Sequence, residues 1–405
     1  SVIGKIRNDG QYIVHDKNKE IINAVASEVT KGFLYNRPIK NPNKIFKEPK
    51  LKTPSDFNDI LIKIMSHENM ASRKPVYEKY DKQVQGRTYT ESGVSNSGVL
   101  APFNSSDYPH EIRNVGIALS TDQNPRYGLI SPYWVGVNAT VEAMRNVASS
   151  GATPHAITDC LCFGNPEKPK QMWEFVESTR GISDACKAIT LKDHPEMPTP
   201  IIAGNVSFYN ESKSGAIPPS PIVSCLGKIK NINKSINMNF QKENSLIILV
   251  GKRRNELGGS MYYELFNTLG ANVPKPNLEE VKNEIFSLTS CIDNELITSC
   301  HDISDGGLSS ALSEMTFKNE IGCSVNFQDH DITPEAFLFG ETGGFVLEIE
   351  KRNLAGVEQE FKKNNVKIAS IGKTKSNKRI KINEEINISL IDLKQAWESG
   401  LRDKL

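Results

Sequence analysis

The sequence predicts an α/β protein, because short apolar segments of strand length alternate with amphipathic segments of helical period along most of the chain. Its 405 residues correspond to two or three domains at roughly 100–200 residues each. Three of the apolar segments end in small polar residues, as strands do where they leave a sheet for a ligand-binding loop. These strand-end residues are Asp122, Asp159, Gly204 and Asn205.

Composition excludes several classes of function. Forty-nine basic and 48 acidic residues leave a net charge of +1, so no bulk attraction draws the chain to nucleic acid or to an anionic membrane. The longest apolar run, 246–250, has the length of a strand and not of a membrane span. Seven scattered cysteines include no Cys-x-x-Cys pair, which indicates structural thiols in a reducing cytoplasm.

The elements follow in order along the chain. Residues 2–29 predict short strands and a helical turn around the Asn8-Asp9-Gly10 turn, and the proline- and lysine-rich segment that follows predicts a solvated linker. A helix capped by Ser55 or Asp56 opens a long mixed region. A second compact unit begins at the strand 246–250, and an amphipathic helix closes the chain. The predicted division is 1–35, a tail of a preceding domain; 36–54, linker; 55–243, first unit; and 244–405, second unit.

Two helices are predicted after the strands of the first unit. Asn138 is expected to cap one that ends near Gly151, and apolar residues from Met172 to Ile189 recur every three or four positions in the next. That apolar stripe indicates core packing and not a cofactor site.

The start of the chain resembles a later segment. Residues 1–6 (SVIGKI) echo 369–374 (ASIGKT), and each is followed by a polar turn and an alternating strand. Such self-similarity indicates duplicated domains, so the chain is expected to open at the tail of a repeat whose body precedes it. Coincidence in a six-residue match is the alternative.

The strand-end residues suit a nucleotide and Mg²⁺. An Asp binds a cation or a ribose hydroxyl, an Asn offers a carbonyl oxygen to Mg²⁺, and a Gly admits a nucleotide close to the backbone. Ser207, in the string Gly204–Asn210, offers a hydroxyl to a phosphate. The same residue types also cap strands, and this alternative stays open for each of them taken alone. We therefore predict a nucleotide and Mg²⁺ site around Asp159 and Asn205.

Other motifs are less informative. The segment 301–307 (HDISDGG) invites an acid/base interpretation, but two glycines before a helix favour an architectural role. Residues 341–344 predict a turn at a domain edge. The chain has no Walker loop, dinucleotide fingerprint, nucleophile elbow or His-Glu-x-x-His motif.

Several strings together resemble one family. Segments 76–85 (VYEKYDKQVQ), 121–127 (TDQNPRY) and 156–169 (AITDCLCFGNPEKP) are continued in order by 181–186, 204–210 and 301–308. In these segments the chain is similar to phosphoribosylformylglycinamidine synthase, the synthetase component of a purine-biosynthesis amidotransferase. The resemblance covers about residues 1–400.

The resemblance implies the second half of a pseudo-symmetric ligase, with an A-type and a B-type domain of the aminoimidazole-ribonucleotide-synthetase superfold. It implies ATP and Mg²⁺ as cofactors and formylglycinamide ribonucleotide as substrate. Asp159 and Gly204 match the family's ATP contacts, Asn205 its Mg²⁺ ligand and Ser207 a substrate contact. Asp122 occupies a strand-end position to which the resemblance carries no catalytic role.

The resemblance also implies partners in the cytoplasm: the first synthetase half, which carries the family's catalytic histidines, a glutaminase subunit that supplies ammonia, and a small bridging subunit. Departures from the pattern occur at 123–125, where glycines are missing, at 340–344, and in about eight extra residues around 192–198. Two alternatives remain: a related enzyme of the superfold, such as aminoimidazole ribonucleotide or selenophosphate synthetase, and a non-catalytic nucleotide-binding half.

Overall fold

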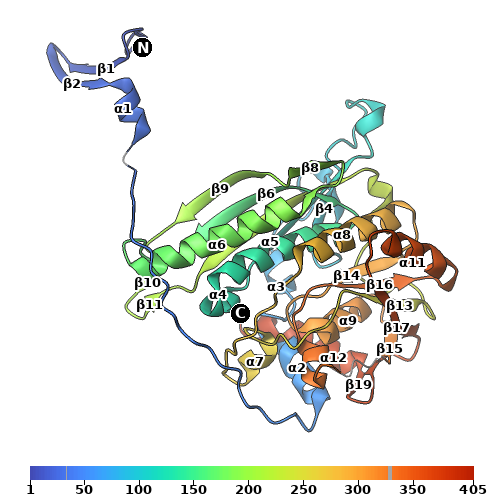
Figure 1. Cartoon of the computed structure of the whole chain (residues 1–405). Coiled ribbons are helices and arrows are strands. Elements are labelled where there is room, and N and C mark those ends of the chain that lie inside the picture. Colours follow the sequence, from blue (N-terminus) through green and yellow to red (C-terminus); the bar gives the residue numbers. More distant parts are fainter. Residues whose placement is uncertain (33, 327–330) are drawn as a thin grey trace.

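Two mixed β-sheets organise the chain in a computed structural model that describes residues 1–32, 34–326 and 331–405 (Figure 1). The first sheet has six strands, and its strand order places the parallel pair β6–β9 at one edge. In spatial order the strands are β3 (Thr88–Thr90), β4 (Gly98–Leu100), β5 (Gly116–Asp122), β12 (Ser220–Ile229), β6 (Thr153–Cys162) and β9 (Ile201–Ser207).

Helices cover one face of this sheet. Along β12 buried residues alternate with partly exposed ones, so one face points into a core and the other does not. The buried face packs against α5 (Pro132–Ser149), which in turn packs along α6 (Pro169–Ala188). We call the other side the open face; there Leu119 of β5 is 43% exposed, and its ladder partner Leu226 is partly exposed.

The second sheet has seven strands and lies between two cores. Along its central strand β13 (Leu246–Val250), Leu246, Ile248 and Val250 enter the core shared with the first sheet, whereas Ile247 and Leu249 enter a second core. This alternation is what a strand buried on both faces requires. In spatial order the strands are β14 (Ser299–Asp302), β16 (Phe345–Ile349), β13, β17 (Ile368–Lys375), β15 (Gly322–Val325), β18 (Arg379–Ile382) and β19 (Ile386–Ser389).

Helices line both faces of the second sheet. On the side of the first sheet lie α8 (Leu278–Asp293) and α11 (Leu354–Lys363), and on the other lie α9 (Gly307–Phe317) and α12 (Leu390–Arg402). Shorter elements complete the fold: α3 (Lys74–Tyr77), α4 (Pro125–Ile130), α7 (Met261–Leu265), α10 (Pro334–Phe339), β7 (Thr190–Leu191), β8 (His194–Pro198), β10 (Glu211–Ser212) and β11 (Gly215–Ala216).

Helix α2 (Phe57–Ser66) begins where the sequence predicts it. The Asp56 side chain accepts hydrogen bonds from the backbone N–H groups of Asn58 and Asp59. The apolar face of α2 is buried in the second core, against α12, α7 and α9. The helix therefore packs with the later unit, although residues 55–243 are predicted to form the earlier one; that division stays a prediction.

Helix α5 begins earlier than the sequence predicts. Its cap is Ser131, whose Oγ accepts a hydrogen bond from the Trp134 N–H, and the helix runs from Pro132. Asn138 lies inside the helix, and its amide donates to the carbonyls of Trp134 and Pro274. The expected cap was wrong because tertiary contacts satisfy an Asn side chain that, in isolation, favours a helix start.

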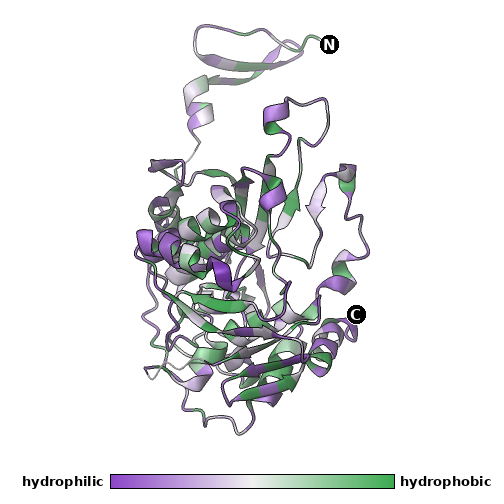
Figure 2. Ribbon diagram, turned by 90° about the vertical axis from the view of Figure 1, so that its right-hand side faces the viewer, coloured by the Kyte–Doolittle hydropathy of each residue, from purple (hydrophilic) through white to green (hydrophobic). Residues whose placement is uncertain are grey.

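The N-terminal segment stands apart from the body (Figures 1 and 2). It consists of the hairpin β1 (Gln11–Asp16) and β2 (Lys19–Val25) and helix α1 (Ala26–Lys31), which buries no residue. The linker that follows is pinned at Glu48, whose carboxylate accepts hydrogen bonds from the Tyr263 hydroxyl and from the backbone N–H groups of Ala271 and Asn272. Within the described residues no helix has the length and apolarity to cross a bilayer.

Candidate functional site

The strand-end residues fall into register across the first sheet. Asp122 of β5 pairs with Val223 of β12, Val223 pairs with Asp159 of β6, and Asp159 pairs with Gly204 of β9. Neighbouring strands are ~4.8 Å apart, so the backbones of Asp122 and Asp159 are separated by about 10 Å. Because Val223 is fully buried, this row lies on the helix-covered face.

Asp159 and Gly204 depend on each other sterically. A Cβ atom at Gly204 would lie 2.5 Å from Oδ1 of Asp159, closer than any side chain allows. No hydrogen bond to the Asp159 carboxylate occurs among the residues that the structure describes, and partial burial raises its pKa. Glycine is thus the residue that leaves room for this carboxylate at the edge of the sheet.

Asn205 and Ser207 point to the opposite face. They are the ladder partners of Cys160 and Cys162, one position out of step with the row that contains Gly204. Asn205 is exposed, and the Ser207 hydroxyl lies 3.1 Å from the amide nitrogen of Asn210, which donates to it. The four residues predicted to bind ligands therefore lie on the neighbouring strands β6 and β9, in two pairs that point to opposite faces of the sheet.

A cleft between the two sheets gathers a different set of polar residues. Its volume is about 370 Å³, and it is lined by the end of β5, by α5 and by the loop after β14. In it the amide of Asn146 donates to Oδ1 of Asp122 at 2.9 Å. The second oxygen of Asp122 and the amide oxygen of Asn146 are buried without a hydrogen-bond partner among the described residues, so two acceptors of this linked pair stay unsatisfied.

The carboxylates of this cleft perturb one another. Desolvation by the surrounding protein raises the pKa of Asp122 to about 7, and the nearby Asp302 adds to the rise. Desolvation likewise raises the pKa of Asp305 to about 6 and that of Glu142 well above its usual range. Perturbed acids that share a cleft are a common mark of a functional site.

Arg145 forms a buried ion pair with Asp302. Nε of Arg145 lies 2.6 Å from Oδ1 of Asp302, and both side chains are at least 96% buried. The pair occupies Asp302, so Asp122, Glu142 and Asp305 remain as the carboxylates without an ion-pair partner among the described residues that line the cleft.

The His301–Gly307 segment builds one wall of the cleft. The ring nitrogens of His301 lie 2.9 Å from a Glu314 oxygen and 3.0 Å from the Asn96 amide nitrogen. Gly306 and Gly307 adopt positive φ angles of 73° and 71°, which lead the chain from β14 into α9. Glu341, predicted in an edge turn, accepts hydrogen bonds from the Tyr127 hydroxyl and from the N–H groups of Met261 and Gly306.

Sequence reasoning missed Glu142 and Asn146, and it considered Asp305 only within the segment 301–307, for which it favoured an architectural role. Glu142 and Asn146 are four residues apart, so they share one face of α5, a helix in which most residues are apolar or small. That i, i+4 pair of oxygen-bearing side chains was the available signal. Their convergence with Asp122 depends on how α5 lies across the sheet, which the spacing does not reveal.

The cleft offers carboxylate and amide oxygens, the ligands that Mg²⁺ prefers. Within residues 1–32, 34–326 and 331–405, no three His, Cys, Asp or Glu side chains already converge as a metal site. The unsatisfied acceptors of Asp122 and Asn146 nevertheless have the chemistry that a hard cation requires.

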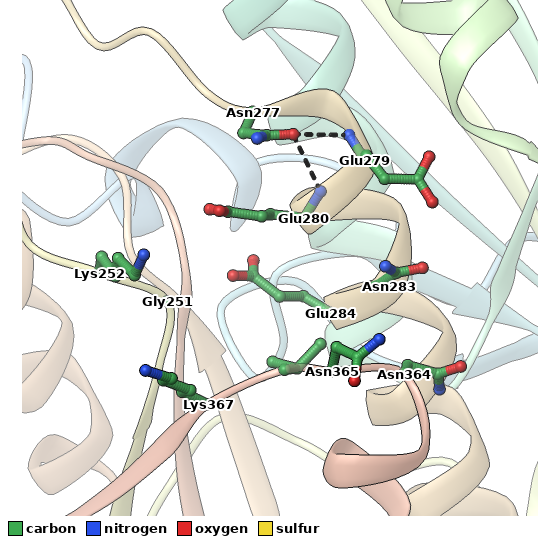
Figure 3. Close-up of a pocket in the computed structure, with 11 residues that line it drawn as sticks. Gly251, Lys252, Asn277, Glu279, Glu280, Asn283, Glu284, Asn364, Asn365 and Lys367 are labelled. Carbon is green, nitrogen blue, oxygen red and sulfur yellow. Dashed lines mark hydrogen bonds between the residues drawn. The ribbon is translucent and has the colours of Figure 1, made fainter.

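A second cavity, of about 290 Å³, opens at the start of α8 (Figure 3). Glu284 is buried in its wall, and burial raises the pKa of this carboxyl to about 7. Lys252 and Lys367 lie across from α8 (Figure 3). None of the residues predicted to bind a ligand lines this cavity.

Comparisons with known proteins agree with this architecture. The model of the AIR synthase related protein, N-terminal domain, matches residues 107–229, and that of the C-terminal domain matches residues 242–384; together they cover more than half of the chain. The chain belongs to the AIR synthase related family. The predicted superfold is thereby confirmed.

Curated relatives confirm the narrower resemblance. A phosphoribosylformylglycinamidine synthase subunit PurL from Methanothrix thermoacetophila is 39% identical over 414 residues, covering 100% of this chain and 52% of that protein. Subunits of the same name from Bartonella quintana and Methanocaldococcus jannaschii are each 32% identical over 98% of this chain, and the match covers 52% and 54% of them. The chain spans about half the length of the curated relatives it matches.

Solved structures share the fold. T. maritima PurL complexed with FGAR matches with a TM-score of 0.65 and 15% identity, over 84% of this chain and 54% of that one. T. maritima PurL complexed with ADP matches with a TM-score of 0.62 and 16% identity, over 84% and 52%. At these identities the likeness concerns architecture alone.

Proposed function

We propose that this chain is the nucleotide-binding half of a phosphoribosylformylglycinamidine synthase, an ATP-dependent carbon–nitrogen ligase of purine biosynthesis. The observation that carries the proposal is the 39% identity to a subunit of that name along the whole chain. In the proposed reaction the γ-phosphoryl group of ATP passes to the amide oxygen of formylglycinamide ribonucleotide. Ammonia then attacks the amide carbon and phosphate leaves, giving formylglycinamidine ribonucleotide and ADP.

In this proposal β9 and the end of β6 hold the ligands. Asp159 and Gly204 contact ATP, Asn205 is a Mg²⁺ ligand and Ser207 contacts the ribonucleotide. The strand β9 is a free edge of the sheet and largely exposed, so a ligand that crosses this edge reaches both faces. That geometry supports a shared role for two pairs of residues that point in opposite directions.

The cleft is proposed as a second place for Mg²⁺, with oxygens from Asp122, Asn146 and Asp305. Mg²⁺ neutralises phosphate charge when it is bound. The chain's own residues position the ligand. Asn146 orients the Asp122 carboxylate, and the ion pair with Arg145 neutralises the charge of Asp302.

Partners complete the proposal. The first half of the synthetase would supply the catalytic histidines, a glutaminase subunit would supply ammonia from glutamine, and a small subunit would bridge them in the cytoplasm. The proposal needs no contact with nucleic acid or membrane, in line with a net charge of +1.

Reconstitution tests the function. The chain is mixed with the first half of the Methanothrix relative, ATP, Mg²⁺, formylglycinamide ribonucleotide and ammonium, and phosphate release is measured. We expect turnover that needs both halves and that Asn205→Ala reduces at least 100-fold. Asn283→Ala, in the α8 cavity, is the matched control and keeps full rate.

Two results would point elsewhere. ADP binding without turnover, with both halves folded, favours a non-catalytic nucleotide-binding half. Turnover of formylglycinamidine ribonucleotide by the chain alone favours an aminoimidazole ribonucleotide synthetase.

A further inference from the structure

Two thiols lie together on the open face of the first sheet. Cys160 and Cys162 occupy alternate positions of β6, so both side chains leave the strand on the same side. Their Sγ atoms are 3.6 Å apart, and both residues are partly exposed. The other five cysteines are buried. This pair is therefore the accessible dithiol of the chain.

The dithiol sits beside two residues of the predicted ligand strand. Across the parallel ladder Cys160 pairs with Asn205, and Cys162 pairs with Ser207. Across the antiparallel ladder their partners are Ile222 and Ser220, which are partly exposed. Since β9 is exposed along nearly its full length, a small ion reaches the sulfurs from solvent.

The spacing of the sulfurs matches the bite of a tetrahedral thiolate-bound cation. Two sulfurs at the ~2.3 Å bond length of zinc lie about 3.8 Å apart at a tetrahedral angle, close to the observed 3.6 Å. A disulfide fits less well. Alternate residues of an extended strand are about 6.7 Å apart at Cα, the upper end of the range that a disulfide bridges.

We propose that Cys160 and Cys162 form a site for a soft divalent cation of the zinc and cadmium class. On binding, two S–H bonds break, two metal–sulfur bonds form and two protons pass to solvent, with no electron transferred. Among the described residues no third His, Cys, Asp or Glu joins the pair. Water molecules therefore supply the remaining two ligands of a tetrahedral ion, and the site stays open to exchange with solvent.

Cadmium titration tests the site on the intact chain. The protein is kept reduced with a phosphine, without nucleotide or ribonucleotide, and the thiolate-to-cadmium charge-transfer absorbance is followed. We expect saturation at one ion per chain, and at least a tenfold loss of affinity in both Cys160→Ser and Cys162→Ser. His194→Ala, which removes an exposed imidazole near Glu196, is the control and leaves binding unchanged.

Three results would overturn the proposal. One is saturable binding that neither serine variant weakens. Another is no absorbance band while all seven thiols react in denaturant. The third is a count of five reactive thiols in protein purified and denatured without reductant, which identifies a Cys160–Cys162 disulfide instead. Thermal midpoints of the serine variants, which differ from wild type by one atom, verify folding. Because the titration uses no ATP, its failure leaves the proposed function untouched.

Discussion

At the scale of single residues, strand parity decides which predicted ligands face each other. Consecutive residues of β9 alternate between faces, so Gly204 joins the Asp159 row while Asn205 joins Cys160. The prediction that these residues lie where strands end follows from the sequence. Their separation into two pairs follows from a register that only the paired strands define.

The contact between Gly204 and Asp159 makes a sharp prediction. Gly204→Ala places a methyl group 2.5 Å from Oδ1 of Asp159 and must displace this carboxylate. We expect the affinity for ADP, measured by calorimetry in the presence of Mg²⁺, to fall at least tenfold. The strand is exposed, so the thermal midpoint should change little. Ala203→Gly at the neighbouring position is the control, and equal losses in both variants would refute the steric explanation.

The buried ion pair between Arg145 and Asp302 leads to a second prediction. Asp302→Asn removes the charge that compensates Arg145, and both side chains are almost fully buried. Loss of one partner of a buried pair costs about 3–5 kcal/mol of unfolding free energy. Urea denaturation measures the change. Asp305→Asn, three residues further along the chain and without an ion pair among the described residues, should cost far less. Similar costs would show that the ion pair is not what stabilises the fold here.

At the scale of elements, small residues set how helices meet. The backbone oxygen of Ser66 at the end of α2 would lie 2.1 Å from a Cβ at Gly400 of α12, and Nε1 of Trp397 donates to the Met70 carbonyl nearby. The close crossing of α2 and α12 therefore requires a glycine at position 400. This contact joins segments more than 330 residues apart in sequence, which the helical period of neither segment predicts.

The crossing predicts opposite effects of one substitution at two sites. Gly400→Ala gains helix propensity of up to ~1 kcal/mol but forces the helices apart, which typically costs 1–3 kcal/mol. We expect a net loss of stability in urea unfolding. At Gly356 in α11 the new Cβ would meet only the flexible Leu296 side chain at 3.3 Å, so Gly356→Ala should be neutral or stabilising. Stabilisation by both would show that α2 does not pack tightly on α12.

At the scale of the whole molecule, buried acids tie stability to pH. Burial raises the pKa of Glu284 to about 7, and desolvation in the cleft raises that of Asp122 to about 7 and of Asp305 to about 6. Between about pH 4 and these raised pKa values, each acid is neutral in the folded chain but ionised in the unfolded chain. The stability they contribute is complete below about pH 4 and is lost as pH rises through 6 to 7. Asp122 and Asp305 are partly exposed whereas Glu284 is buried, so Glu284 should contribute the larger share.

The thermal midpoint should therefore fall by several degrees between pH 5 and pH 8. Glu284→Gln should flatten this dependence, because its side chain cannot ionise. Mg²⁺ should raise the midpoint at pH 8 and not at pH 5 if the cleft binds it, and Asp122→Asn should abolish that gain while Glu284→Gln keeps it. Calorimetry at fixed ionic strength measures each of these thermal midpoints. A midpoint that rises with pH would contradict the predicted direction of the pH dependence.

The fold class, the family and the strand ends where ligands are expected can be predicted from the sequence, because hydrophobic period, turn residues and long motif strings are local properties. It did not reveal the start of α5, since Asn138 is satisfied by Pro274 from a distant loop. Nor did it reveal the cleft that brings Glu142 and Asp305 to Asp122. These features emerge only in the folded chain, because strand register and helix crossing depend on contacts between segments that the local sequence does not encode.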